Sequence, residues 1–533
     1  MRKTSERLAE LCIALLWIAA PLTAATCDDL RSLTLKDTTI LSANTVPAGD
    51  FTLPGADPET LSTFKKLPAF CRIAGVAKPS ADSDIRFEIW LPLTDWNGKF
   101  QGVGNGGFAG SISYGAGAMS RSLSRGYATA STDTGHQGIM VDATWARGHP
   151  EKVIDFGYRA IHLTAEYAKT AIRAFYGKDA TNSYFMSCSN GGRQALMEAQ
   201  RFPADYDGII AGAPANFFTH LLAQSLWNVQ ATLGDPASYI PAAKLPAIAS
   251  AVLDACDALD GLKDGLLDDP LKCHFRPETL LCRGADSDTC LTKPQVTALE
   301  KIYSGPHDSQ GRSLFPGDLP GGETGPGGWG LWITGPAPGK SLQVYFSTNF
   351  FSNLVFADPQ WPFRNFNFDR DLKTADEKSA AALNSTDPNL EAFRKRGGKL
   401  ILYHGWSDAA ISPQNTIDYY NSVIAKMGPQ QTGSFVRLFM APGMQHCAGG
   451  PGPNSLFDSG AEHNPDHVDT ALERWVESGV APNRIIATKY QDDSNHTSGI
   501  VRTRPLCPYP QVARYSGTGS IDDAANFACV APR

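Results

Sequence analysis

The sequence predicts an α/β fold with a mostly parallel sheet and a large, loop-rich insertion. Strand-like apolar runs alternate with helical patterns over most of the chain, which is typical of parallel strands covered on both faces. Residues 215–390 interrupt this alternation and are rich in Pro, Gly, Asp and Cys. The 533 residues also exceed the roughly 250–300 at which one hydrophobic core stops growing. We therefore expect a core of residues 26–214 and 391–533, and an inserted segment of residues 215–390.

Each predicted element follows from the periodicity of its apolar residues. Strands are short apolar runs, either alternating or continuous, whereas helices repeat their apolar residues every three to four positions. The predicted strands begin at Arg86, Lys99, Tyr127, Ser183, Asp207, Lys399 and Val436. The clearest predicted helices cover residues 153–175, 192–201 and 468–478.

Composition and charge exclude several classes of protein. With 42% hydrophobic and 19% charged residues, the chain is apolar enough to fold and too poor in charge to be disordered. The 47 Lys and Arg residues are outnumbered by 54 Asp and Glu residues, which gives a net charge of −7. Because no overall basic field would hold a phosphate backbone, we expect no nucleic-acid partner.

The N-terminus carries a secretory signal pattern. Basic residues precede an apolar run from Leu11 to Ala20, and small residues follow at positions 23–25. A run of about 10–12 apolar residues is too short to span a bilayer core of about 30 Å. We therefore expect cleavage after about residue 25, secretion to the periplasm or outside the cell, and no membrane partner. Loss of Cys12 would leave ten of the eleven cysteines, an even number suited to an oxidising compartment.

Ser189 is the candidate nucleophile. A strand-like run ends in Ser187-Cys188-Ser189, and a helical pattern follows from Asn190 onward. A sharp strand-to-helix turn between small residues is the nucleophile elbow of α/β-hydrolases, which exposes the serine hydroxyl. Ser187 stands where the pattern G-x-S-x-G has its first Gly. A surface turn would explain the short motif alone, but the flanking strand and helix favour a nucleophile.

A nucleophilic serine needs a base, and the base needs an acid that orients it. In α/β-hydrolases these follow the serine in the order acid, then histidine. Asp408 and His446 lie just beyond the last two predicted strands of the core, so we predict them as acid and base. His404 lies within the strand end before Asp408, and we expect it to pack in the core. His136 is predicted to be a structural residue near the site.

Two cysteines adjoin the candidate serine and histidine. Cys188 immediately precedes Ser189, and Cys447 immediately follows His446. A disulfide between them would hold their Cα atoms about 4.4–6.8 Å apart and bring the serine and histidine together. Buried free thiols are the alternative, but the doubled adjacency favours the disulfide. Pairing the other cysteines by proximity gives four further hypotheses, Cys27–Cys71, Cys256–Cys273, Cys282–Cys290 and Cys507–Cys529.

Three motifs together resemble the tannase and feruloyl esterase family of secreted α/β-hydrolases. They are Cys-Ser-x-Gly-Gly from Cys188, Ser-Asp at positions 407–408 and His-Cys at positions 446–447. The resemblance covers nearly the whole mature chain and implies Ser189 as nucleophile, His446 as base and Asp408 as the orienting acid. It also implies that Gly104 and Asn190 donate the oxyanion-hole N–H groups and that the inserted segment forms a lid.

An acidic loop in the inserted segment is a candidate metal site. The run CDALDGLKDGLLDDP from Cys256 holds closely spaced aspartates broken by glycines, and clustered carboxylates suit a hard cation such as Ca²⁺. The spacing is not that of an EF-hand, and a solvated acidic turn is the alternative. The resemblance implies structural calcium held by side chains and backbone carbonyls, namely Asp257, Asp260 and Asp264 with the carbonyls of Leu262 and Leu266.

The resemblance further implies a small aromatic ester as substrate. The family acts on esters of ferulate and other hydroxycinnamates, on gallate esters and, in one branch, on the monoester of terephthalate with ethylene glycol. Plant polysaccharides and polyphenols carry such acyl groups. The residues expected around the acyl group are Trp332, Leu342, Phe346, Ser347 and Ile411.

Two of these positions favour a neutral acyl group. The terephthalate branch has an Arg at the position of Leu342 that would clamp the second carboxylate, and an aromatic residue at the position of Ile411. We therefore predict a feruloyl esterase first, a tannase second and a mono(2-hydroxyethyl) terephthalate hydrolase third. The non-enzyme alternative is a secreted protein that binds polyphenols or glycans without turnover, and the complete set of triad residues disfavours it.

Overall fold

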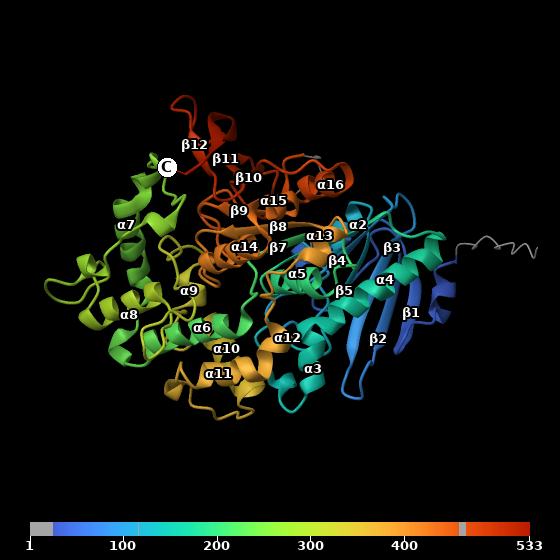
Figure 1. Ribbon diagram of the computed structural model, residues 1–533, viewed down its shortest axis with the longest axis horizontal. Helices are drawn as coiled ribbons and strands as arrows, with labels where there is room; N and C mark the ends of the chain where they lie inside the picture. The colour runs from blue at the N-terminus through green and yellow to red at the C-terminus, as the bar shows by residue number, and fades with distance from the viewer. Residues whose placement is uncertain (1–24, 116, 458–464, 533) are drawn as a thin grey trace, which may run out of the picture.

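A computed structural model describes residues 25–532, apart from residue 116 and residues 458–464 (Figure 1). The predicted signal peptide, residues 1–25, lies outside the described residues except for Ala25. The centre of the molecule is a nine-stranded sheet with the order β1-β2-β3-β5-β4-β6-β7-β8-β9. Figure 1 shows this sheet with helices on both of its faces.

The sheet is parallel over six strands and antiparallel at one edge. The parallel strands are β5 (Ala128–Thr132), β4 (Lys99–Val103), β6 (Asn182–Cys188), β7 (Gly208–Gly212), β8 (Lys399–Gly405) and β9 (Val436–Ala441). The antiparallel strands are β1 (Thr38–Val46), β2 (Phe70–Ala77) and β3 (Ile85–Pro92), and β3 also pairs antiparallel with β5. The predicted mostly parallel sheet is therefore confirmed, and every predicted strand is present in it.

Alternation along the strands gives the sheet two buried faces. On β6, Phe185 packs in the apolar cluster with α4 (Ala160–Tyr176), α5 (Asn190–Arg201) and α14 (Pro413–Met427). Its neighbour Tyr184 packs in another cluster with α16 (Val468–Ser478). Successive strand residues point to opposite faces, so the two clusters cover the two sides of the sheet. α2 (Met119–Ser124) packs beside β3 and β5.

The long predicted helix over residues 153–175 is interrupted near its start. The structure has α3 (Pro150–Ile154), one π-helical turn at Asp155–Arg159, and then α4. Pro150 suits a first helical turn, because its missing N–H would have no partner there. Gly177 ends α4 at a φ of 69°, a left-handed conformation that glycine adopts without steric cost.

The inserted segment lies between β7 and β8 and contributes no strand to the nine-stranded sheet in the described residues. α6 (Phe218–Leu233) packs on α8 (Lys293–Ser304) and α10 (Leu342–Asn349). A separate apolar cluster, which includes Ile248 and Trp329, supports the segment from within. Its other helices are α7 (Leu245–Cys256), α9 (Trp329–Trp332), α11 (Asp371–Ala375) and α12 (Ala381–Leu383). Figure 1 shows this green-to-orange part of the chain beside and below the sheet.

The remaining elements complete the core. Short helices are α1 (Pro58–Phe64), α13 (Glu391–Lys395) and α15 (Pro429–Phe435). The chain ends in two small antiparallel sheets that the sequence pattern does not predict, β10 (Ile485–Tyr490) with β11 (Ile500–Leu506), and β12 (Val512–Tyr515) with β13 (Phe527–Val530). Among the helices of the described residues, none has the length and apolar character needed to cross a membrane.

All five predicted disulfides are present. Their Cα–Cα separations lie between 5.0 and 5.9 Å, within the usual range for the bond. Cys27–Cys71 joins the N-terminal end of the described chain to β2, and Cys507–Cys529 joins the C-terminal segments. Cys256–Cys273 and Cys282–Cys290 lie within the inserted segment.

Candidate active site

The turn between β6 and α5 presents Ser189 in a strained conformation. Ser189 has a φ of 65° and a ψ of −127°, and such a conformation costs a non-glycine residue about 1–3 kcal/mol. Its backbone N–H donates to Gly212 O at 2.9 Å, which fixes the turn against β7. This is the geometry of the nucleophile elbow expected from the sequence.

Two glycines make room for the departure from the G-x-S-x-G pattern at Ser187. A Cβ atom added to Gly191 would lie 1.8 Å from Ser187 Oγ, and one added to Gly104 would lie 2.9 Å from Ser187 Cβ. Both contacts are too short for any side chain larger than hydrogen. The elbow therefore tolerates a serine at its first small position because two neighbouring backbones lack side chains.

Ser189, His446 and Asp408 form one hydrogen-bonded chain. His446 Nε2 lies 2.9 Å from Ser189 Oγ, and His446 Nδ1 lies 2.8 Å from Asp408 Oδ2. The Asp408 side chain is fully buried, whereas 11% of the His446 side chain is exposed. The structure thus brings together the three residues that the sequence selected, at distances suited to a nucleophile, a base and an orienting acid.

Asp408 is held by four donors. Its Oδ1 accepts the backbone N–H groups of Ala410 at 2.8 Å and Ile411 at 3.1 Å, and its Oδ2 faces both His446 and His404. Burial alone would raise the pKa of Asp408, but the charge of His446 and the hydrogen bonds from His404 and His446 hold that pKa below its ordinary value. The carboxylate therefore stays ionised beside the histidine that it orients.

His404 is buried in the core, as predicted, and it is also a hydrogen-bonding partner of Asp408, which the sequence did not predict. Its side chain is fully buried, with Nε2 3.0 Å from Asp408 Oδ2 and 3.1 Å from Ile411 O. Both atoms are acceptors, so the ring proton is assigned to Nε2. Nδ1, 2.7 Å from Thr416 Oγ1, then accepts the hydroxyl proton. The spacing of His404 and Asp408 along the chain gives no sign of this contact.

The Cys188–Cys447 disulfide ties the elbow to the loop that carries His446. Its Cα atoms are 5.9 Å apart across a sequence separation of 259 residues. Each cysteine adjoins one member of the serine–histidine pair. The bond therefore limits how far the two loops can separate.

His136 has the structural role expected for it. Its Nε2 lies 2.9 Å from Phe108 O, and its ring stacks on Trp145 with centroids 3.9 Å apart. Burial lowers the pKa of His136 to about 4. The ring is therefore neutral near neutral pH.

The two residues predicted to form the oxyanion hole follow neighbouring strands of the sheet. Gly104 follows β4, and Asn190 is the first residue of α5. Within the described part of the chain, no hydrogen-bond acceptor lies against the N–H of either residue. Side-chain bonds hold the two backbones together, because Asn190 Nδ2 donates to Asn105 O at 3.1 Å and Gln194 Nε2 donates to Asn105 Oδ1 at 2.8 Å.

A cavity of about 250 Å³ opens beside Ser189. Its wall combines residues that flank the triad with residues of the inserted segment, and no Lys, Arg, Asp or Glu lines it among the described residues. Trp332 meets the His446 ring edge-on at 5.0 Å and stacks with Phe346 at 6.1 Å. The apolar side chains on the wall are Met140, Ala215, Phe218, Leu221, Leu222, Trp332, Phe346, Ala410 and Ile411.

The structure corrects part of the predicted pocket. Trp332, Phe346 and Ile411 line the cavity, whereas Leu342 and Ser347 do not. Ser347 is fully buried, and its hydroxyl donates to Gln343 O at 2.6 Å. Leu342 is the first residue of α10, and Gln343 and Phe346 are the residues of that helix that reach the cavity.

One face of α6 also lines the cavity, although the sequence did not predict it. Phe218, Leu221, Leu222 and Ser225 line the cavity, and their spacing is that of one helix face. Phe218 is near the elbow in the fold, because it packs edge-on against Phe108, which follows β4. The periodicity was visible in the sequence, but nothing in it indicated which site this face would meet. Gly106 and Gly107, rather than Gly104, complete the wall below the elbow.

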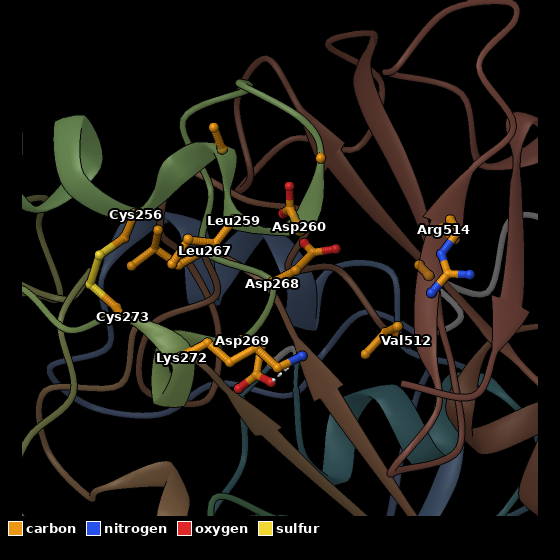
Figure 2. A pocket seen from close by; sticks show the side chains of 13 residues that line it. Cys256, Leu259, Asp260, Leu267, Asp268, Asp269, Lys272, Cys273, Val512 and Arg514 are labelled. Atoms are coloured by element: carbon orange, nitrogen blue, oxygen red, sulfur yellow. Dashed lines mark ion pairs between the residues drawn. A yellow bond between two sulfur atoms is a disulfide. The ribbon is translucent and has the colours of Figure 1, made fainter. Parts of the chain in front are cut away.

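The acidic loop of the inserted segment borders a second cavity, of about 300 Å³ (Figure 2). Asp260 and Asp268 face this cavity, and Arg514 lies across it. The loop bonds its own backbone, since the Asp257 carboxylate accepts N–H groups from residues 264 and 265, and Asp260 Oδ1 accepts one from residue 262. Asp264 Oδ2 contacts Arg504 at 2.5 Å and Arg502 at 3.4 Å.

Several features of this loop fit a bound cation. Burial raises the pKa of Asp260 to about 6 and that of Asp268 to about 7, and neighbouring aspartates add to both shifts. Within the described residues Asp268 Oδ1 is buried without a hydrogen-bond partner. A cation would supply the missing positive charge. It would replace hydrogen bonds that the carboxylates of Asp257, Asp260 and Asp264 now make to backbone N–H groups and arginines.

The fold and the site define the class of the protein. A serine elbow, a histidine and an aspartate meet at the carboxyl ends of strands in a mostly parallel sheet, which is the arrangement of an α/β-hydrolase. Over residues 71–530 the sequence matches the profile of the family described as tannase and feruloyl esterase. The chain belongs to this family and is a carboxylic ester hydrolase.

Comparison with individual proteins places the chain among esterases. It is 44% identical to an uncharacterised esterase of Xanthomonas campestris pv. campestris, over 95% of this chain and 91% of that protein. It is 37% identical to mono(2-hydroxyethyl) terephthalate hydrolase of Piscinibacter sakaiensis, over 90% and 87% of the two chains. The crystal structure of feruloyl esterase B from Aspergillus oryzae matches with a TM-score of 0.84 at 30% identity, covering 95% of this chain and 99% of that one.

Proposed function

We propose that the protein is a secreted serine esterase that hydrolyses esters of aromatic phenolic acids, with feruloyl esters preferred. The observation that carries this proposal is the cavity beside Ser189. Aromatic rings of the inserted segment wall it, and no charged carboxylate or amine lines it among the described residues. Its volume of about 250 Å³ lies just below the roughly 300–1,000 Å³ of pockets for drug-sized ligands, which suits a single aromatic acyl group.

The reaction proceeds in two steps through an acyl-enzyme. Ser189 Oγ attacks the ester carbonyl while His446 Nε2 takes the hydroxyl proton, and ionised Asp408 stabilises the imidazolium. The N–H groups of Gly104 and Asn190 donate to the oxyanion. His446 then returns the proton to the leaving alcohol. In the second step His446 activates a water molecule, which attacks the acyl carbon and releases the acid and free Ser189.

The polar groups of the cavity favour a phenolic acyl group that carries few hydroxyls. Ser225 and Gln343 are the polar side chains that the inserted segment contributes to the wall. The Ser225 hydroxyl donates to Leu221 O at 3.1 Å, and its oxygen can still accept a hydrogen bond from a phenol. A free carboxylate, as in the terephthalate monoester, would find no Lys or Arg on the described wall and would be buried without a counter-charge.

Three esters measured side by side test the substrate. We expect kcat/KM to be highest for methyl ferulate, lower for methyl gallate with its three hydroxyls, and lowest for mono(2-hydroxyethyl) terephthalate. A preference for the terephthalate ester would contradict the assignment, and the relative of that name makes this ester a necessary competitor. A preference for gallate would make the protein a tannase.

Ser189→Ala tests the nucleophile itself. Turnover should be lost while the circular dichroism spectrum and the melting temperature stay close to those of the wild type. Ser187→Gly is the matched control, because it restores the small-residue pattern of the elbow and should leave turnover in place. Turnover by the Ser189→Ala variant close to the wild-type rate would remove Ser189 from the mechanism.

A structural calcium ion in the acidic loop is a further part of the proposal. Asp257, Asp260 and Asp264 would supply carboxylates, and Leu262 and Leu266 would supply backbone carbonyls. When bound, the ion supplies positive charge that holds the loop closed. Addition of Ca²⁺ to protein that has been stripped of metal with a chelator should raise the melting temperature, and Asp260→Asn should weaken that response. A melting temperature insensitive to Ca²⁺ would contradict the site.

Secretion is supported by the signal pattern and by the five disulfides, which are typical of oxidising compartments. N-terminal sequencing of the protein recovered outside the cytoplasm should begin near residue 26. Recovery of an uncleaved chain in the cytoplasm would contradict this part of the proposal.

A further inference from the structure

A second cluster of ionisable side chains lies on the side of α5 that packs against α4. His162 comes from α4, Glu198 from the last turn of α5, and Asp205 from the loop before β7. One potential ligand atom of each lies within 4.8 Å of the other two. Glu198 is nine residues beyond Ser189, which is about 13 Å along a helix. The cluster is therefore separate from the triad.

Glu198 is the least satisfied member of the cluster. Its side chain is almost completely buried, with 1% of the residue exposed. Among the described residues it is the one carboxylate for which both oxygens are buried without a hydrogen-bond partner. Native proteins rarely leave a buried carboxylate in this condition. Such a group requires a proton or a cation.

The nearest protein cation does not fill this need. Lys169 Nζ donates to the main-chain oxygens of Ala204, at 3.3 Å, and Asp205. Its bonds therefore go to backbone carbonyls and not to the two carboxylates. His162 Nδ1 lies 2.6 Å from Asp205 Oδ2, so among the described residues no cationic side chain forms an ion pair with Glu198.

We propose that His162, Glu198 and Asp205 bind a divalent transition-metal ion of the Zn²⁺ class. One imidazole nitrogen with two carboxylate oxygens is a ligand set that Zn²⁺ accepts, with a fourth position for water. Phe202 stacks on the His162 ring at 3.8 Å and holds its Nδ1 toward Asp205. The His162 side chain is 23% exposed, so an ion can enter from solvent.

Binding exchanges a proton for the ion. Glu198 releases the proton that neutralises it when no ion is bound. The hydrogen on His162 Nδ1 moves to Nε2, so the imidazole stays neutral and the ion lies between Nδ1 and Asp205 Oδ2. Ligand distances of about 2.0–2.2 Å place tetrahedral ligands about 3.3 Å apart, so the pair opens slightly. The ion then ties α4, α5 and the loop before β7 together, which is a structural role distinct from ester hydrolysis.

The test uses the full mature chain without an affinity tag. The protein is stripped with a chelator, saturated with Ca²⁺ and titrated with Zn²⁺ by calorimetry, and bound metal is counted by mass spectrometry. We expect one Zn²⁺ per chain at this site and a higher melting temperature. Glu198→Gln should weaken Zn²⁺ binding by more than about 100-fold, beyond the 10–100-fold typical for residues that only support ligands.

Glu166→Gln is the matched control. Glu166 lies 3.8 Å from His162 Nε2, but its side chain is 56% exposed, so this variant should keep the Zn²⁺ affinity and the melting response. Turnover of an aryl ester by each variant reports that the core has folded. If Glu198→Gln does not fold, His162→Asn, at the solvent side of the cluster, takes its place.

Two results would overturn the inference. If wild-type protein binds no Zn²⁺, Co²⁺ or Mn²⁺ at millimolar concentration, the cluster holds a proton instead of an ion. If Glu198→Gln binds Zn²⁺ as tightly as the wild type, the ion binds elsewhere on the chain.

Discussion

Replacing His404 with Phe should lower kcat/KM about 10-fold while leaving the fold in place. The ring keeps its approximate size in a fully buried position, but the Nε2–H donor to Asp408 is lost. Asp408 would then be held by three donors instead of four. We expect a less firmly oriented carboxylate, and through it a less firmly oriented His446.

The magnitude follows from the geometry around Asp408. A hydrogen bond to a charged group contributes about 1.5–3 kcal/mol. The contact of His404 Nε2 with Asp408 is 3.0 Å long and is shared with Ile411 O at 3.1 Å, so the low end applies. About 1.4 kcal/mol corresponds to a factor of ten. Thr416 and Ile411 O also lose a partner, so the free energy of unfolding should fall by about 1–3 kcal/mol.

The assay is steady-state hydrolysis of an aryl ester at 25 °C, with the free energy of unfolding measured in urea. The loss should appear in kcat more than in KM, because His404 does not line the cavity. Thr416→Val is the control, since it removes only the outer partner of His404 and should have a smaller effect on kcat. If His404→Phe folds and keeps kcat within about twofold, His404 serves packing alone and the reasoning fails.

Three further predictions concern other parts of the site. The double variant Cys188→Ala/Cys447→Ala should lose about 2–5 kcal/mol of its free energy of unfolding, measured in urea. It should also lose most of its kcat for ester hydrolysis. Full activity after verified loss of the bond would contradict the link between the two loops. Ser225→Ala should lower kcat/KM for methyl ferulate about 2- to 10-fold, which corresponds to one neutral hydrogen bond. The kcat/KM for methyl cinnamate, which has no ring hydroxyl, should be unchanged. Equal losses for the two esters would contradict a contact between Ser225 and the phenol. Burial lowers the pKa of His136 to about 4, so the unfolded chain takes up this proton near pH 6.5 and the folded chain does not. The free energy of unfolding should therefore fall by about 3 kcal/mol between pH 6.5 and pH 4, and His136→Asn should flatten that slope; identical slopes for variant and wild type would refute it.

Most strands that local pattern controls were predictable, although β2, which alternates buried and partly buried residues, was missed. The parallel strands are short segments rich in apolar or small residues, because both of their faces are buried. β1 was not predictable in this way, since most of its residues are partly or fully exposed. The C-terminal hairpin of β10 and β11 was missed as well, because only part of β11 is buried.

In the candidate site, too, residues marked by a local motif were predictable, and contacts that depend on the fold were not. Ser189 and His446 were predictable because each adjoins a cysteine and follows a strand. The contact of His404 with Asp408 was not, because it depends on how the chain turns after β8. Glu198 and His162 lie 36 positions apart on two helices, and no local motif marks their meeting. Leu342 occupies the position that the family resemblance implies for the pocket, whereas the packing of α10 brings Gln343 to the cavity instead.

Two parts of the chain build the cavity, and they have different functions: one carries the catalytic residues and the other contacts the acyl group. Ser189, Asp408 and His446 follow strands of the sheet, whereas Phe218, Trp332 and Phe346 belong to the inserted segment. Substitutions in the inserted segment can thus alter which acid is accommodated while the bond-breaking atoms stay in register. Substrate range can drift over evolutionary time, or be redesigned, without rebuilding the catalytic machinery. Trp332 belongs to the inserted segment, but its ring contacts His446. Substitution of Trp332 should therefore alter substrate selectivity and catalytic rate together.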